Sequence, residues 1–73
     1  MKLSACAYLV NGDMLDVGVY NQASLHKLQS EGYSGRHLIH ALITDDWGAP
    51  PRFVKFTGKD DNGVPVEIVI PYD

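Results

Sequence analysis

The sequence predicts a small α+β domain, in which two β-hairpins form a three- or four-stranded antiparallel sheet with one or two short helices on one face. Apolar segments flank an Asn-Gly pair near each end of the chain, and Asn-Gly is the strongest short signal of a hairpin turn. Between the hairpins, two segments repeat apolar residues at helical spacing. The 73 residues suffice for a single domain, residues 1–73.

The first predicted hairpin spans residues 2–20, and its register has two alternatives. A two-residue Asn-Gly turn pairs Tyr8 with Leu15, whereas a three-residue turn pairs Leu9 with Leu15. Turn chemistry favours the first register, and the matching of apolar residues favours the second. A slip of one residue exchanges the buried and the exposed side of a strand, so the two registers bury different faces.

Two helices are predicted in the middle of the chain. The first covers residues 20–32, where Asn21 can cap the helix N-terminus and Gly32 can supply the left-handed residue that ends it. The second covers residues 35–43, with Ser34 as its cap, because the apolar residues there lie four apart. A buried strand over the same residues is the alternative.

The second predicted hairpin spans residues 52–72. Its last segment alternates apolar and polar residues, which is typical of a half-buried strand. A tight turn would pair Val66 with Lys59, and a five-residue loop would pair Val66 with Phe56. Packing favours the longer loop, with Gly63 in the left-handed conformation. The prolines of the last segment cannot donate to a ladder, so this strand is expected at an edge of the sheet.

No catalytic or cofactor motif is evident in the chain. Paired aspartates fall in predicted loops, where turns recruit Asp because it bonds the nearby backbone. His37 and His40 lie three apart, but a zinc site needs at least three well-placed ligands and no spacing links these two to others. We therefore expect a protein that is not an enzyme and that holds no metal or cofactor.

Composition limits the classes of partner. Nine acidic and six basic residues give a net charge of −3, which argues against direct nucleic-acid binding. No apolar run approaches the roughly 20 residues of a membrane span, and the first 13 residues resemble a strand more than a signal peptide. Cys6 is the only cysteine, so it is expected as a small buried apolar residue of an intracellular, cytoplasmic chain. The expected state is a monomer or a weak dimer.

The segment 44–53, TDDWGAPPRF, carries the only tryptophan of the chain beside a Gly-Ala-Pro-Pro break. Trp47 has two interpretations: a cap that folds back on a small core, or a contact for a partner. The prolines stiffen the chain that follows, which lowers the entropy lost on binding. The residues expected to contact a partner are Trp47, Pro50, Pro51, Arg52, Lys2 and His37.

In size, mild acidity, lack of a disulfide and expected setting, the chain resembles small phage-encoded regulators that bind host RNA polymerase. The resemblance lies in overall format, and no functional residue is carried over from it. It implies binding to polymerase subunits in the bacterial cytoplasm and control of initiation and termination. An open strand edge that adds a partner's strand is one way to bind. The alternatives are an inhibitor of a host defence nuclease complex, of the anti-CRISPR type, and a self-associating structural module.

Overall fold

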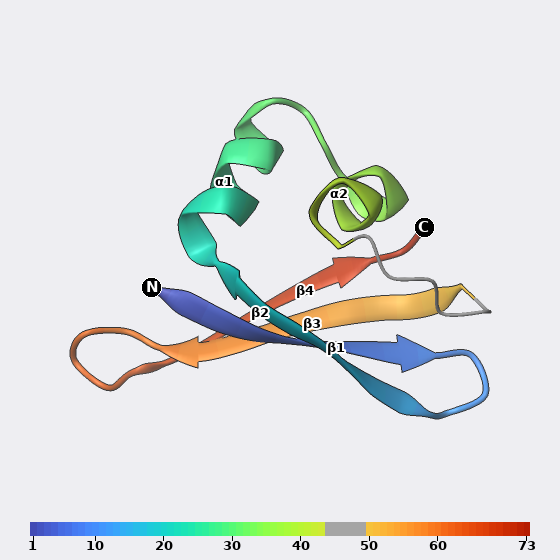
Figure 1. Ribbon diagram of the computed structural model, residues 1–73, viewed down its shortest axis with the longest axis horizontal. Helices are drawn as coiled ribbons and strands as arrows, with labels where there is room; N and C mark the ends of the chain where they lie inside the picture. The colour runs from blue at the N-terminus through green and yellow to red at the C-terminus, as the bar shows by residue number, and fades with distance from the viewer. Residues whose placement is uncertain (44–49) are drawn as a thin grey trace.

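The computed structural model describes residues 1–43 and 50–73, and it confirms the predicted α+β class with four strands and two helices (Figure 1). The strands form one antiparallel sheet in the order β2-β1-β3-β4. The elements are β1 (Lys2–Leu9), β2 (Met14–Asn21), α1 (Gln22–Ser30), α2 (Gly35–Leu42), β3 (Pro51–Lys59) and β4 (Pro65–Pro71). As expected from its prolines, β4 lies at an edge of the sheet.

Capping residues mark the ends of the two helices. The side chain of Asn21 accepts a hydrogen bond from the Ala23 N–H at 3.1 Å, which confirms the predicted cap of α1. Gly32 follows α1 with a φ of 94°, in the left-handed region that ends helices. The segment predicted as either helix or strand forms α2. Ser34 stands at its N-cap, but its side chain makes no cap hydrogen bond.

The two hairpins use the same kind of loop. In the first, the Gly12 N–H donates to the Leu9 carbonyl at 3.1 Å, and in the second the Gly63 N–H donates to the Asp60 carbonyl at 2.9 Å. The two glycines have φ values of 93° and 77°. Each loop is therefore a turn that ends in a left-handed glycine after asparagine, as predicted for Gly63.

Neither predicted register of the first hairpin holds beside its turn, since Ala7 pairs with Leu15. The chain reverses one residue earlier than either alternative assumed. A bulge then leaves Val17 between two successive pairs, so that Ser4 pairs with Val19, as the two-residue turn predicted. Because of this extra residue, the pairs beyond the bulge follow the register that the two-residue turn predicted.

The predicted registers of the second hairpin are also wrong. Phe56 pairs with Ile68 and Lys59 pairs with Pro65, because the loop is longer than the tight turn and shorter than the five-residue loop. The favoured alternative still placed the right side of the strands inward, since a shift by two residues preserves the face. Phe56 is accordingly buried.

The hydrophobic core lies between the two helices and one face of the sheet. β1 contributes the small residues Ala5 and Ala7 to this core, and the helices contribute larger ones, such as Leu25 and Leu38. The core also includes apolar residues from all four strands, and its buried members are Leu3, Ala5, Ala7, Val17, Leu25, Leu38, Ile39, Ile43, Val54, Phe56 and Ile70.

Cys6 does not belong to this core. It alternates with the buried residues Ala5 and Ala7, so its side chain lies on the opposite face of the sheet and is half-buried. The expectation of a buried cysteine is therefore wrong, because the alternating residues Ala5 and Ala7, and not Cys6, face the helices.

Candidate interaction surface

One face of the sheet has no described helix against it; we call it the open face. On the two central strands, the side chains that alternate with the core residues lie on this face. They are exposed or half-buried, whereas the residues between them, Ala5 and Ala7 on β1 and Val54 and Phe56 on β3, are buried. The central residues of the open face are Ser4, Cys6 and Tyr8 of β1 and Phe53, Lys55 and Thr57 of β3.

A row of apolar residues crosses the open face from one edge to the other. Tyr8 pairs with Met14 on one side and with Phe53 on the other, and Phe53 pairs with Pro71. The rings of Tyr8 and Phe53 are stacked, with centroids 4.6 Å apart and planes 20° apart. Met14 is 60% exposed. The four strands therefore carry one continuous apolar row (Met14, Tyr8, Phe53 and Pro71) that no described helix covers.

Lys55 lies beside this apolar row and contacts both the row and a residue of β4. Its Nζ lies 5.3 Å from the centroid of the Tyr8 ring and 3.9 Å from Oε1 of Glu67. A cation over an aromatic ring is attracted by the negative face of the ring. Beside Lys55, Val69 of β4 is 45% exposed. The stacked rings and the lysine thus hold each other in place at the surface.

Both edges of the sheet offer incomplete ladders to a further strand. On β2, the Gly18 N–H donates to Oδ1 of Asp16 at 2.9 Å, beside the bulge at Val17. On β4, Pro65 and Pro71 have no N–H to donate. Bulges and prolines are features by which proteins prevent pairing at sheet edges. The open face is therefore a better candidate surface than either edge.

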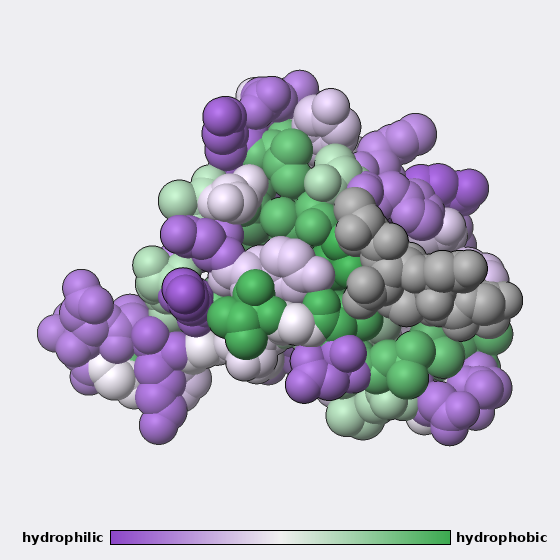
Figure 2. Space-filling model, viewed as in Figure 1, coloured by the Kyte–Doolittle hydropathy of each residue, from purple (hydrophilic) through white to green (hydrophobic). Residues whose placement is uncertain are grey.

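Polar and apolar side chains are unevenly distributed over the view in Figure 2. Figure 2 shows hydrophilic side chains gathered over the loop between β3 and β4 and over the outer sides of the helices. Hydrophobic side chains reach the surface between the helices and along the strands. Among the large hydrophobic residues of the described ranges, Val10, Met14 and Val19 have the largest exposed fractions, at 65%, 60% and 60%.

The residues predicted to contact a partner do not form one patch. Trp47 lies outside the described residues. Pro50 is exposed, but Pro51 is buried opposite Leu9, so its ring offers little surface to a partner. Arg52 is exposed because it is the extra residue of a bulge at the start of β3. This bulge lies beside the Phe53 end of the open face.

Lys2 and His37 lie far from that bulge. Lys2 begins β1, whereas the bulge faces the end of the same strand, about 20 Å away at the usual rise of a strand. His37 lies on α2, on the other side of the sheet, where it lines a shallow open hollow with Glu31, Gly32 and Tyr33. Neither residue can share a small contact patch with Arg52.

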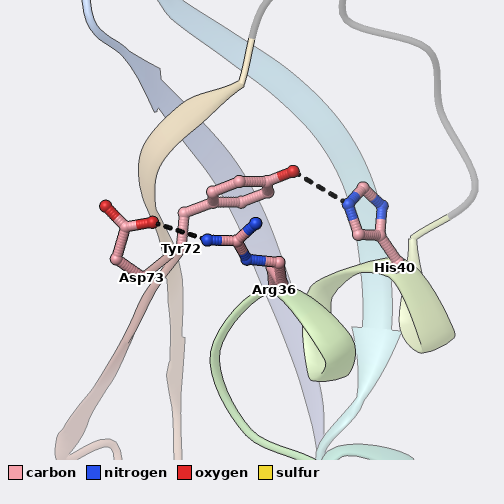
Figure 3. A network of polar contacts seen from close by, with 4 residues as sticks. All are labelled: Arg36, His40, Tyr72 and Asp73. Carbon is pink, nitrogen blue, oxygen red and sulfur yellow. Dashed lines mark hydrogen bonds and ion pairs between the residues drawn. The ribbon is translucent and has the colours of Figure 1, made fainter.

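A cluster of polar contacts lies between α2 and the last two residues of the described chain (Figure 3). Nε2 of His40 lies 3.0 Å from the Tyr72 hydroxyl, and the Arg36 guanidinium lies 3.1 Å from Oδ1 of Asp73 and 5.3 Å from the centroid of the Tyr72 ring. His40 thus contacts another side chain of the same chain, which is an ordinary structural role. The cluster links Tyr72 and Asp73 to the helical side of the sheet.

Sequence reasoning missed Tyr8, Phe53 and Lys55 as surface residues. A signal was present in the segment RFVKFTG, where Lys55 marks the outward side of the strand. Phe53 lies two residues before Lys55 and therefore shares its face. An aromatic residue in the same phase as a lysine indicates an apolar surface residue.

The chain matches no known family model, and no curated protein or solved structure is similar to it. Within residues 1–43 and 50–73, no three His, Cys, Asp or Glu side chains are grouped to hold a metal ion. No helix in the same part of the chain is long and apolar enough to cross a membrane. The geometry of the open face is thus the main guide to function.

Proposed function

We propose that the protein is a small non-enzymatic regulator that binds another protein through the open face of its sheet. The apolar row across all four strands carries this proposal. Protein interfaces combine a central group of aromatic and apolar side chains with a polar rim. The stacked Tyr8 and Phe53 rings supply the centre, and Thr57 and Glu67, which pair with each other across β3 and β4, supply part of the rim.

The stiffness of the surface supports the same role. Tyr8 and Phe53 lie on central strands and are packed against each other, so binding would immobilise few additional bonds. Ordering a flexible side chain at an interface costs about 0.5–1.5 kcal/mol, and a preorganised surface avoids most of that cost. A small domain can thereby bind a partner with a limited area.

The partner to test first is bacterial RNA polymerase, on the resemblance of the chain in overall format to small phage transcription regulators. Binding to polymerase subunits would let so small a protein alter initiation and termination without contacting nucleic acid. A host defence nuclease complex and a second copy of the chain are the other partners, and the experiment below distinguishes them.

The test is direct binding of the purified protein to purified polymerase, measured alongside affinity capture from bacterial lysate. The double variant Tyr8→Ser, Phe53→Ser removes the centre of the open face. Lys27→Ser, on the exposed side of α1, is the matched control. We expect the wild type and the control to bind polymerase and the double variant to lose binding.

Other outcomes change the partner or the surface. Loss of a captured nuclease complex from the double variant would replace polymerase by that complex. Sedimentation that shows a concentration-dependent dimer, lost in the double variant, would identify a self-associating module. A folded double variant that binds every captured protein as the wild type does would refute the open face as the contact surface.

A further inference from the structure

The open face differs in charge from the rest of the protein. Lys2, Lys55 and Lys59 all lie on the open side of the two central strands, although the whole chain has a net charge of −3. The alternation of buried and exposed residues places Lys2 in the same phase as Tyr8, and Lys59 in the same phase as Phe53. The remaining lysine, Lys27, lies on α1.

No acidic residue accompanies these lysines on β1 or β3. The acids of the open face, Asp16 and Glu67, lie on the two edge strands. Asp16 already accepts a hydrogen bond from the Gly18 N–H at 2.9 Å, and Glu67 lies 3.9 Å from Lys55. Glu67 therefore balances Lys55 in the middle of the open face, and the positive charge that remains on the central strands belongs to Lys2 and Lys59, at one end of these strands.

We propose that the open face binds an acidic segment of a partner protein. Apolar side chains of that segment cover the stacked Tyr8 and Phe53 rings, and its carboxylates face Lys2 and Lys59 at the other end of the central strands. This inference rests on the proposed function and specifies the chemistry of the partner. Opposite charges across an interface raise the rate of association and select among partners.

The spacing of the two ends sets the length of the segment. Tyr8 and Lys2 are six residues apart on one strand, which corresponds to about 20 Å. An extended segment of about six residues covers this distance, and a helix needs about 13 residues at a rise of about 1.5 Å per residue. The acidic residues should therefore lie at one end of the segment and the apolar residues at the other.

A protein partner fits this surface better than a single-stranded nucleic acid does. Stacking of bases needs free aromatic faces, whereas Tyr8 and Phe53 stack on each other and Lys55 lies over the Tyr8 ring. Both rings are half-buried. The overall negative charge also opposes a continuous phosphate backbone, while a few carboxylates need only a few lysines.

The experiment is an NMR titration of the labelled protein with two synthetic 14-residue peptides. Both carry the same Leu and Phe residues at one end, and they differ only in having Glu or Lys at the other end. The variants are the double charge reversal Lys2→Glu, Lys59→Glu and the control Lys27→Glu. We expect the acidic peptide to shift open-face amides and to bind about tenfold more tightly than the basic peptide, with affinity that falls as salt increases.

The double charge reversal should weaken the acidic peptide about tenfold, and Lys27→Glu should leave it unchanged. Equal or tighter binding of the basic peptide would overturn the inference, and so would the lack of any open-face shift with either peptide. A thymidine oligonucleotide that binds the same face more tightly than the acidic peptide would replace it by nucleic-acid binding.

The variants also separate this inference from the proposed function. If Tyr8→Ser, Phe53→Ser abolishes binding to the captured partner and the charge reversal does not, the open face binds proteins but does not select acidic segments. If neither set of changes affects that partner, the proposed function fails as well.

Discussion

The two faces of the sheet are built from the same strands but are completed in different ways. On the inner face, Leu3, Val54 and Phe56 are almost inaccessible to solvent because α1 and α2 cover them. On the open face, the alternating residues Tyr8 and Phe53 are only half-buried, and they pack on each other rather than on a helix. Within single strands, alternation therefore separates the side chains that build the core from those that we propose contact a partner.

This comparison is most directly tested by two phenylalanines of β3. Phe56→Ala should destabilise the fold by about 3–5 kcal/mol, because it removes a buried ring and leaves a cavity, whereas Phe53→Ala should cost much less since its ring is half-buried. Urea unfolding followed by circular dichroism measures both. If Phe56→Ala is too unstable to purify, Phe56→Leu gives a smaller loss. Equal losses for Phe56→Leu and Phe53→Leu would contradict the separation of the two faces.

The hairpin turns belong to neither face, and substitutions there should lower the free energy of unfolding by an intermediate amount. Gly12→Ala and Gly63→Ala should each cost about 1–2 kcal/mol, because both positions have a left-handed backbone that residues with a Cβ disfavour. Apart from the glycine and its two chain neighbours, no heavy atom of the described residues lies within 4 Å of the Cβ that either substitution adds. Thermal unfolding should therefore show similar losses for the two variants. A loss for only one would mean that the two loops are not equivalent in solution.

The stacked pair of the open face should contribute little to the free energy of unfolding. A double-mutant cycle with Tyr8→Ala and Phe53→Ala should give a coupling of about 0.5–1.5 kcal/mol, the usual range for an aromatic pair. Binding of the partner should change far more than stability does. A coupling above this range, with binding unchanged, would assign the pair to the stability of the sheet.

The smallest effect is expected at the exposed ion pair on the helical side. Arg36→Gln should change the free energy of unfolding by less than about 1 kcal/mol, because both Arg36 and Asp73 are largely exposed and water screens the pair. Repeating the measurement at high salt should remove most of that small difference. A larger loss that persists in salt would show that Arg36 acts through its contact with the Tyr72 ring.

Helix caps and turn residues could be predicted from the sequence where a single residue determines them. Asn21 at the start of α1 and Gly63 in the second hairpin are examples, since their roles depend only on neighbouring backbone groups. The registers were not predictable, because the bulge at Val17 adds one residue and its position depends on pairing across the sheet. A register is a property of two strands rather than of one.

The open face could not be predicted from the sequence for a related reason. In the middle of β1, one alternating set holds the small residues Ala5 and Ala7 and the other holds the larger residues Cys6 and Tyr8, so side-chain size does not mark the core side there. Only the position of the helices decides which set is covered. The unusual composition of the segment around Trp47 instead predicted a contact there, whereas Tyr8 and Phe53 become neighbours only once β1 pairs with β3.

The pairing of β1 with β3 also has a consequence for the rate of folding. Each hairpin joins residues that are close in sequence, and hairpins form in about 1–10 μs. The central pairing instead joins Ser4 to Thr57 and Tyr8 to Phe53 across most of the chain. Closing so long a loop loses entropy before any contact is gained, and such non-local contacts slow folding. The slowest step should therefore be the docking of two preformed hairpins, and the open face exists only after that step is complete.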